Sequence, residues 1–208
     1  MYTVYAFSTP NSVKVPIALE ELGVPYQLNP VNLRAGEQKS EEFLDLNPNG
    51  KVPVLVDTDR TLVLSESAAI LVHLAEKHGK LLPRDALGRA RAFEQLFAHA
   101  SGLSPAFGQA GYFQKLAPEP VPHAVHRFVT EAKRQLTLLD GVLEVREFVA
   151  GDEFSIADIA HFGWVWRRGF PDLSLDDAPN VKRWYEAVHH RPAVGTAIGK
   201  VEALVPAA

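Results

Sequence analysis

Residues 47–57 read Asn47-Pro48-Asn49-Gly50-Lys51-Val52-Pro53-Val54-Leu55-Val56-Asp57, and this stretch decides the fold. Its first four residues are strong turn formers. The apolar, β-branched run that follows predicts a strand over 52–57. Pro53 cannot donate to a strand ladder, so it belongs at a sheet edge, at a bulge or after a cis peptide bond. A cis Val52–Pro53 bond would turn the Val52 amide and carbonyl outward toward an extended, peptide-like ligand, whereas a trans edge proline is the commoner case.

The segments on either side of this strand predict a small mixed sheet with helices packed on it. Gly23 is placed to end the first helix, and Pro16 fits only the first turn of that helix. A helix between two strands makes them parallel, whereas a short turn makes an antiparallel hairpin. The predicted order is β-α-β-α-β-β-α, with strands at 2–7, 26–33, 52–57 and 60–64 and helices at 13–22, 40–46 and 66–78.

The second half of the chain predicts helices alone. Apolar residues recur there at steps of three and four, the spacing of amphipathic bundle helices. Ser155 and Asp158 have the spacing of a capping box at a helix start. We therefore expect an α/β domain followed by an all-α domain, divided as 1–79, a linker at 80–87, and 88–208. The expected helices are 89–110, 125–143, 154–168, 178–189 and 193–204.

Composition narrows the possible chemistry. The 208 residues are 47% hydrophobic and 22% charged, which is typical of a soluble globular protein. The absence of cysteine excludes a disulfide scaffold, a cysteine nucleophile and a thiolate metal site, so any thiol chemistry must use a ligand's thiol. The net charge of -4 argues against nucleic acid or an anionic membrane as partner. No signal peptide or spanning segment is visible, so we expect a cytoplasmic location, and His189-His190 lacks a third metal ligand.

Two polar segments could bind a ligand where a helix is expected to begin. The turn Ser8-Thr9-Pro10-Asn11-Ser12 lies before the first helix, where free amides and the helix dipole favour an anion. Asn11 or Ser12 acting as a plain N-cap is the alternative. The second segment is Leu64-Ser65-Glu66-Ser67, which leads into a predicted helix. Its Ser67 could bind a carboxylate and its Glu66 an ammonium group, which suits an amino-acid head group. The alternative there is that Ser65 caps the helix.

Three segments together resemble the cytosolic glutathione transferases. They are residues 47–53, 64–70 and 154–160, which have the family's order and spacing, and the match covers essentially the whole chain. Thr9-Pro10-Asn11, followed by Leu19-Glu20-Glu21-Leu22-Gly23, looks like the bacterial nu class. The resemblance implies a thioredoxin-like N-terminal domain, an all-helical C-terminal domain, glutathione as cosubstrate, no metal, and a homodimer.

The resemblance also implies roles for individual residues. Thr9 and Asn11 would face the glutathione sulfur. Ser8 stands where the nu class commonly has proline, and Ser12 where it commonly has glycine, so either serine could supplement or replace that pair. Val52 would pair through its backbone with the cysteinyl unit, and Glu66 and Ser67 would hold the γ-glutamyl group. Gln38 would hold the glycyl end or the backbone near it, and Arg127 would approach the sulfur. The implied glutathione-binding set is Gln38, Lys51, Val52, Pro53, Glu66, Ser67 and Arg127.

The activity implied is that of a glutathione transferase. The bound thiol would be activated for conjugation to electrophiles, for glutathione-dependent disulfide reduction, or for peroxidase chemistry. Four aromatic residues of the helical half suggest an apolar pocket for the second substrate: Phe107, Tyr112, Phe113 and Trp166. A non-catalytic module of the same fold, which binds glutathione or a protein partner, is the alternative.

Overall fold

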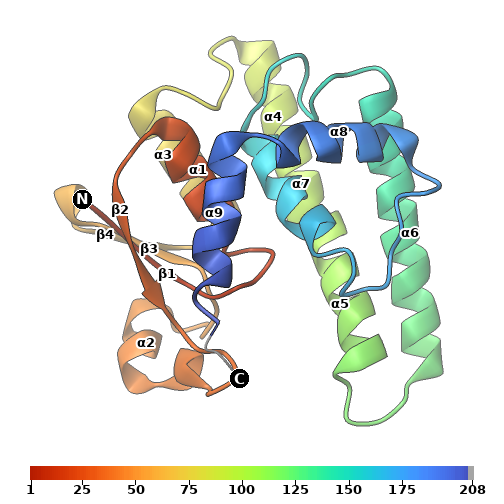
Figure 1. Cartoon of the computed structure of the whole chain (residues 1–208), viewed down its shortest axis with the longest axis horizontal. Helices are drawn as coiled ribbons and strands as arrows, with labels where there is room; N and C mark the ends of the chain where they lie inside the picture. The colour runs from red at the N-terminus through yellow and green to blue at the C-terminus, as the bar shows by residue number, and fades with distance from the viewer. Residues whose placement is uncertain (206–208) are drawn as a thin grey trace. The chain divides into compact units, whose positions relative to one another are not determined.

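A computed structural model describes residues 1–205 of the chain, which form two compact units (Figure 1). One unit comprises residues 1–81 together with the C-terminal segment that begins at His190, and the other comprises residues 82–189. The sequence-based division assigns 190–208 to the helical domain instead, and residues 206–208 lie outside the described part. The packing units and the sequence division therefore differ at this segment, and the sequence domains stay a prediction.

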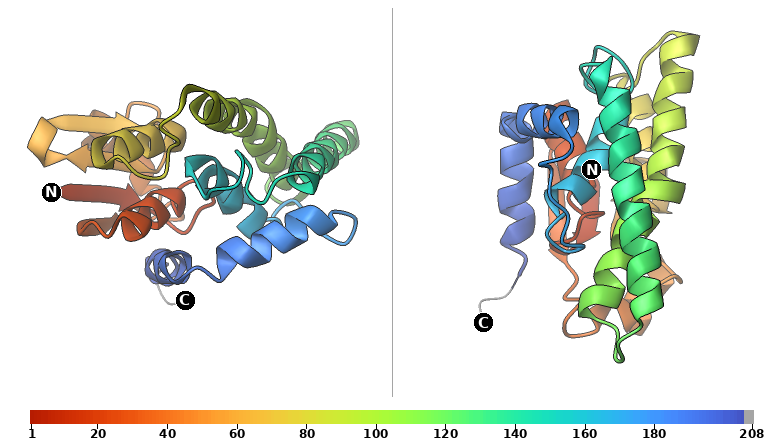
Figure 2. Two further views of the ribbon diagram at one scale, coloured as in Figure 1. Left: turned by 90° about the horizontal axis from the view of Figure 1, so that it is seen from above. Right: turned by 90° about the vertical axis from the view of Figure 1, so that its right-hand side faces the viewer.

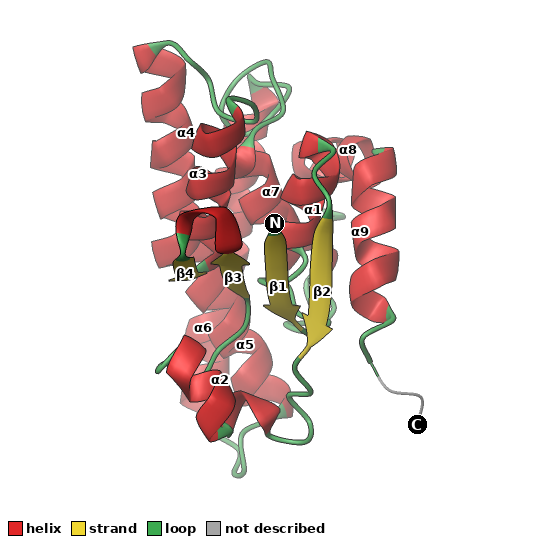
Figure 3. Cartoon of the chain, turned by 90° about the vertical axis from the view of Figure 1, so that its left-hand side faces the viewer, coloured by secondary structure: helices red, strands yellow, loops and turns green. Residues whose placement is uncertain are grey.

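The first unit is built on a four-stranded mixed sheet (Figure 3). Its strands are β1 (Tyr2–Ala6), β2 (Tyr26–Pro30), β3 (Val54–Asp57) and β4 (Leu62–Ser65), arranged in the order β2-β1-β3-β4. β1 is parallel to β2, and the β1–β3 and β3–β4 pairs are antiparallel. The predicted mixed sheet is confirmed. The strand expected at 52–57 begins only at Val54, so Val52 and Pro53 lie outside it.

Helices pack on both faces of this sheet. They are α1 (Lys14–Leu22), α2 (Glu41–Leu46), α3 (Ser67–His78) and α9 (Pro192–Glu202). On one face, Phe43 of α2 lies edge-on to Tyr5, with ring centroids 6.4 Å apart. Because side chains alternate along a strand, the fully buried Val4 and Ala6 point to the opposite face. α1 contacts both α3 and α9, and it ends at Gly23 with the left-handed φ of 67° that the sequence predicts.

The contact between α1 and α9 joins segments from opposite ends of the sequence (Figure 2). Two ion pairs accompany it. The Arg191 guanidinium donates to both carboxylate oxygens of Glu21 at 2.6 and 2.8 Å, and Lys200 Nζ donates to Glu20 Oε1 at 2.6 Å. α9 is therefore part of the same packed layer as the first helix of the chain.

The second unit is helical. It contains α4 (Ala86–Ala98), α5 (Ser104–Lys115), α6 (Pro122–Glu144), α7 (Ile156–Trp166) and α8 (Pro179–His189). The helical run predicted over 89–110 is longer in the structure, from 86 to 115, and it contains a π-helical turn, His99–Leu103, between α4 and α5. Pro105 has no N–H to donate to the preceding turn, and the Ser104 amide donates to the His99 carbonyl, five residues back, which is the widened spacing of the π turn. No helix within residues 1–205 is long and apolar enough to cross a membrane.

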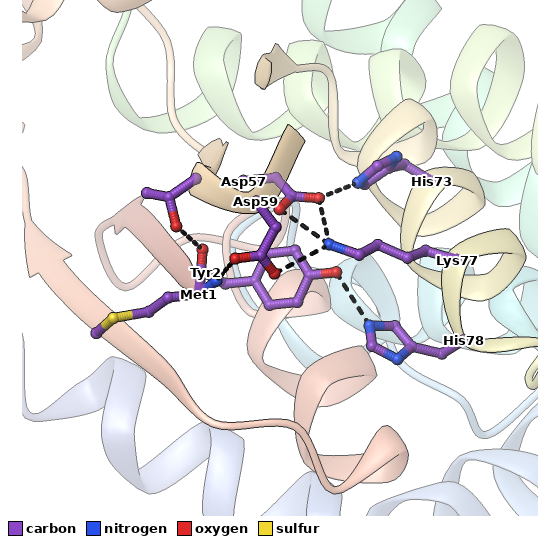
Figure 4. Close-up of polar contacts among 8 residues, drawn as sticks. Met1, Tyr2, Asp57, Asp59, His73, Lys77 and His78 are labelled. Carbon is purple, nitrogen blue, oxygen red and sulfur yellow. Dashed lines mark hydrogen bonds and ion pairs between the residues drawn. The ribbon is translucent and has the colours of Figure 1, made fainter. Parts of the chain in front are cut away.

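A buried ionic cluster ties α3 to the sheet at the end where β1 begins (Figure 4). The Asp57 side chain is fully buried, and both of its oxygens accept hydrogen bonds from Lys77 Nζ, at 2.9 and 2.8 Å. His73 Nε2 lies 2.9 Å from Asp57 Oδ2, and the Tyr2 hydroxyl lies 3.0 Å from His78 Nε2. Because these contacts hold the C-terminal half of α3, they also fix the direction in which its N-terminus points.

Asp57→Asn is expected to lower the free energy of unfolding by about 2 kcal/mol at neutral pH, since it removes a buried charge from two partners. Burial would raise the pKa of Asp57, but the hydrogen bonds from Lys77 and His73 outweigh it and hold the pKa below its ordinary value. The stabilisation is therefore present above about pH 4 and is lost as the pH falls through the folded-state pKa.

Urea unfolding at a series of pH values measures this difference between Asp57→Asn and the wild-type protein. The matched control is Asp59→Asn, because Asp59 also lies near Lys77, at 3.5 Å, but is exposed. A difference that stays constant from neutral to acidic pH would contradict the ionic origin of the effect.

Candidate active site

The sheet register brings three polar segments to one end of the first unit. Tyr5 pairs with Val54, and Val54 pairs with Ser65. At this end the chain leaves β1 for the turn at 8–12, enters β3 from Val52 and Pro53, and leaves β4 for the start of α3. The segments quoted from the sequence as ligand-binding candidates are thus neighbours in space.

The turn after β1 is held by its own hydroxyl groups. Thr9 Oγ1 donates to Ser12 Oγ at 2.9 Å and accepts from the Ser12 amide at 3.0 Å. Ser12 is fully buried, and its Oγ also accepts from the Phe7 amide at 3.4 Å. The N-cap of α1 is Val13, without a side-chain capping bond, so neither Asn11 nor Ser12 is a simple helix cap. Ser8, Thr9 and Asn11 are half-buried, which leaves them accessible to a ligand.

A buried lysine lies beneath this turn. The Lys14 side chain is 1% exposed, and its Nζ donates to Asn11 Oδ1 at 2.8 Å and to Ser67 Oγ at 3.4 Å. Burial lowers the pKa of Lys14 to about 7, against the opposing effect of the Glu66 carboxylate. The sequence analysis missed this residue. The signal that could have found it is a lysine flanked by Val13, Val15 and Ile17 in the first turn, whereas the other charges of this helix lie in its last turn.

The start of α3 has the features of a site for an amino-acid head group. Glu66 precedes the helix with φ 68° and ψ 110°, a conformation that is costly for a residue other than glycine and that clusters at ligand sites. Glu66 is exposed and Ser67 is half-buried. Since the N-cap is Glu66, Ser65 does not cap this helix. A ligand ammonium would meet the Glu66 carboxylate, and a ligand carboxylate would meet the helix N-terminus beside Ser67.

The third segment is the turn before β3. Asn47 is buried, and its Nδ2 donates to the Lys51 carbonyl at 2.7 Å while its Oδ1 accepts from the Asn49 amide at 3.1 Å. The Val52–Pro53 peptide is cis. Gly50 has a φ of 63°, and a Cβ there would lie 2.9 Å from the Gln38 carbonyl oxygen, so only glycine allows the segment that contains Gln38 to approach. The turn and Gln38 are therefore adjacent.

Gln38 offers an acceptor inside this site. Its Oε1 is buried, and no residue in the described part of the chain donates a hydrogen bond to it. A buried polar atom without a partner costs free energy unless a ligand or water supplies one. A peptide-like ligand lying along the Val52 segment could supply that N–H.

The candidates in the helical unit do not surround one cavity among the described residues. Phe107 is fully buried and lies edge-on to Trp164, with ring centroids 6.3 Å apart. Phe113 lines a groove of about 1090 Å³ between α5 and α6. Arg127 is exposed and lines a hollow of about 380 Å³ on α6. Tyr112 is 40% exposed, and Trp166 is half-buried beneath the Arg167 guanidinium. A second-substrate pocket formed by these residues stays a prediction.

Protein-family models match both halves of the chain. The model described as "Glutathione S-transferase, N-terminal domain" matches residues 9–77, and the model described as "Glutathione S-transferase, C-terminal domain" matches residues 103–192. Among curated proteins, the disulfide-bond oxidoreductase YfcG of Escherichia coli is 39% identical over 97% of this chain and 96% of its own length. The disulfide-bond oxidoreductase YghU of the same organism is 39% identical over 91% of this chain and 71% of its own length.

Solved structures show the same similarity. A glutathione transferase from Burkholderia graminis, with two glutathione molecules bound per subunit, superposes with a TM-score of 0.90 at 41% identity. The match covers 95% of this chain and 87% of that one. A glutathione transferase from Pseudomonas putida, with one glutathione disulfide per subunit, has a TM-score of 0.89 at 38% identity and covers 95% of this chain and 90% of that one.

Proposed function

Because the chain belongs to the glutathione S-transferase family, we propose that it is a glutathione-dependent enzyme that uses the polar end of its sheet to bind and activate the glutathione thiol. The observation that carries the proposal is the Tyr5–Val54–Ser65 register, which gathers the three segments on one surface. Glu66 and Ser67 would hold the γ-glutamyl group, the Val52 backbone the cysteinyl unit beside Lys51 and Pro53, and Gln38 the glycyl end. Arg127 as a further contact stays a prediction from the sequence.

The chemical task of the site is to ionise a thiol. A free thiol has a pKa of about 8.5, so only a few per cent is thiolate at neutral pH. Lowering that pKa by about two units takes roughly 2.7 kcal/mol of preferential binding to the anion. Hydrogen bonds from the Thr9 hydroxyl and the Asn11 amide, with the N-terminus of α1, are of that size. Ser8 and Ser12 are the alternative donors. The Thr9 hydroxyl donates its one proton to Ser12 Oγ in the structure, so Thr9 has to release that bond before it can donate to sulfur. Ser12 Oγ accepts from Thr9 and Phe7 and keeps its own proton, but its side chain is fully buried.

The ionised thiol can follow two routes. In conjugation, the sulfur attacks an electrophilic carbon and displaces a leaving group. In disulfide reduction, one glutathione thiolate attacks a disulfide and releases the first thiolate of the substrate. A second glutathione thiolate then attacks the glutathionyl sulfur, which yields glutathione disulfide and the second substrate thiolate. Both electrons come from the two glutathiones, as they must in a chain without cysteine. The relatives named disulfide-bond oxidoreductases favour this second route.

We expect reduced glutathione to bind in isothermal titration calorimetry, and we expect turnover of hydroxyethyl disulfide that exceeds turnover of chlorodinitrobenzene. An absence of binding by both reduced and oxidised glutathione at millimolar concentration would overturn the proposal. Binding without turnover of either substrate would instead favour the non-catalytic module.

Assembly and location complete the proposal. We propose the homodimer that the family resemblance implies, in which an interface would cover Phe97 on α4, a side chain that is 68% exposed and lies beside Phe93 with ring centroids 6.4 Å apart. Light scattering measures the mass directly. The physiological second substrate, an electrophile or a disulfide, and the cytoplasmic location expected from the sequence both stay predictions.

A further inference from the structure

A buried ammonium group connects two of the segments of the active site. Lys14 Nζ lies 2.8 Å from Asn11 Oδ1 in the turn after β1 and 3.4 Å from Ser67 Oγ at the start of α3. At 1% exposed, Lys14 is among the largest fully buried side chains of the described residues. Burying a lysine ammonium is costly unless its partners compensate. The thiol chemistry described above uses Asn11 and Ser67 but assigns nothing to the group between them.

We propose that Lys14 is a positioning residue that holds the carboxamide of Asn11 in the one orientation that directs its NH₂ group at the glutathione sulfur. The inference rests on the proposed function, because it presupposes that Asn11 faces the sulfur. A carboxamide has an acceptor end and a donor end, whereas an ammonium group has only donors. With Lys14 on Oδ1, the end of Asn11 that remains for the ligand is the Nδ2 donor.

The orientation matters because the two ends of the amide have opposite effects on a thiol. An N–H directed at sulfur stabilises the thiolate, whereas a carbonyl oxygen repels it. Without a donor at position 14, the amide of Asn11 can turn round. The bound thiol then loses the preference for its ionised form that Asn11 supplies.

The proton on Lys14 controls the same orientation, because a neutral amine can accept a hydrogen bond from Nδ2. Burial lowers the pKa of Lys14 to about 7, and the Glu66 carboxylate opposes this shift. Two charged groups face α1 from the C-terminal segment: Arg191, the residue before α9, and Lys200 in α9. They are paired with Glu21 and Glu20 in the last turn of α1. A bound thiolate favours the protonated form of Lys14, so ligand binding and the Lys14–Asn11 contact support each other.

The test is the pKa of the thiol of bound glutathione, measured by the ultraviolet absorbance of the thiolate. In Lys14→Met, which keeps an unbranched chain without a donor, this pKa is expected to rise by about one unit, and kcat at about pH 6.5 to fall about tenfold. The deficit in kcat should disappear near about pH 9, where the thiol ionises without help. Lys14→Gln, which offers Asn11 a donor and an acceptor, is expected to give an intermediate thiol pKa. A loss of fold alone would not produce this ordering.

A double-mutant cycle tests whether Lys14 acts through Asn11. The double variant Asn11→Ala with Lys14→Met should lose no more kcat than Asn11→Ala alone, and additive losses would overturn the inference. Lys115→Met is the matched control, because Lys115 also donates to a carbonyl and a carboxylate but belongs to the helical unit.

Failure of the wild-type protein to bind glutathione would refute the proposed function itself. A wild-type thiol pKa that is lowered on binding and unchanged in Lys14→Met would refute only the role of Lys14.

Discussion

Asn11→Ala is expected to lower the kcat of glutathione-dependent hydroxyethyl disulfide reduction by about tenfold to a hundredfold, the usual cost of losing one hydrogen bond to a charged group. The expected loss of stability is only about 1 kcal/mol. Asn11 caps no helix, since the N-cap of α1 is Val13, and Lys14 keeps its contact with Ser67. Steady-state kinetics and urea unfolding of the same preparation compare the two effects.

A partly buried asparagine in the helical unit supplies the control for this experiment. Asn180 Nδ2 donates to Asp140 Oδ2 at 3.1 Å, and its backbone amide donates to Asp140 Oδ1 at 2.8 Å. Asn180→Ala should cost a comparable amount of stability and leave kcat unchanged. If Asn11→Ala lost activity only in proportion to its loss of stability, Asn11 would be a structural residue and Ser8 or Thr9 would become the leading candidate for thiol activation.

Asp158→Ala is expected to have the largest effect on stability, about 3–5 kcal/mol. The Asp158 side chain is fully buried at the start of α7 and accepts four hydrogen bonds. They come from the Val149 amide at 2.8 Å, the Ser155 amide at 2.9 Å, the Ser155 hydroxyl at 3.1 Å and Trp184 Nε1 at 2.9 Å. Removing the carboxylate leaves these buried donors without a partner and also removes half of the capping box.

Ser155→Ala separates the cap from the rest of this network. It removes the hydroxyl that accepts from the Ala157 amide but leaves Asp158 with three donors, so the expected cost is about 1 kcal/mol. The midpoint of urea unfolding and the slope of the transition are measured for both variants. Equal losses from the two substitutions would mean that the contacts of Asp158 with Val149 and Trp184 contribute nothing.

The features that could be predicted from the sequence are those set by local pattern. Alternation and turn residues located the four strands, because each strand is short and bounded by strong breakers such as Asn47-Pro48-Asn49-Gly50. The spacing of Ser155 and Asp158 predicted the capping box that the structure contains. The polar turn at 8–12 and the Glu66-Ser67 pair are separate candidates on their residues alone, and only the resemblance to the glutathione transferases joins them into one site. The strand register then brings both to the same end of the sheet.

The features that could not be predicted depend on contacts between distant segments. The apolar neighbours of Lys14 mark it as unusual in the sequence, but its contacts with Asn11 and Ser67 exist only because α3 and the turn at 8–12 enclose it. Asp57-Thr58-Asp59 is typical of an exposed turn, and only the approach of His73 and Lys77 from α3 makes Asp57 a buried ion-pair partner. The apolar stripe over 89–110 continues through the π-helical turn, so periodicity could not locate it.

The partnership between α1 and α9 has a consequence for synthesis of the chain. The helical unit is continuous in sequence, from 82 to 189, whereas the unit with the sheet takes its last helix from beyond it. A ribosome releases every residue of the helical bundle before Pro192–Glu202 emerges to cover α1. During translation, the surface of α1 that contacts α9 therefore stays without its partner helix while more than half of the polypeptide is synthesised.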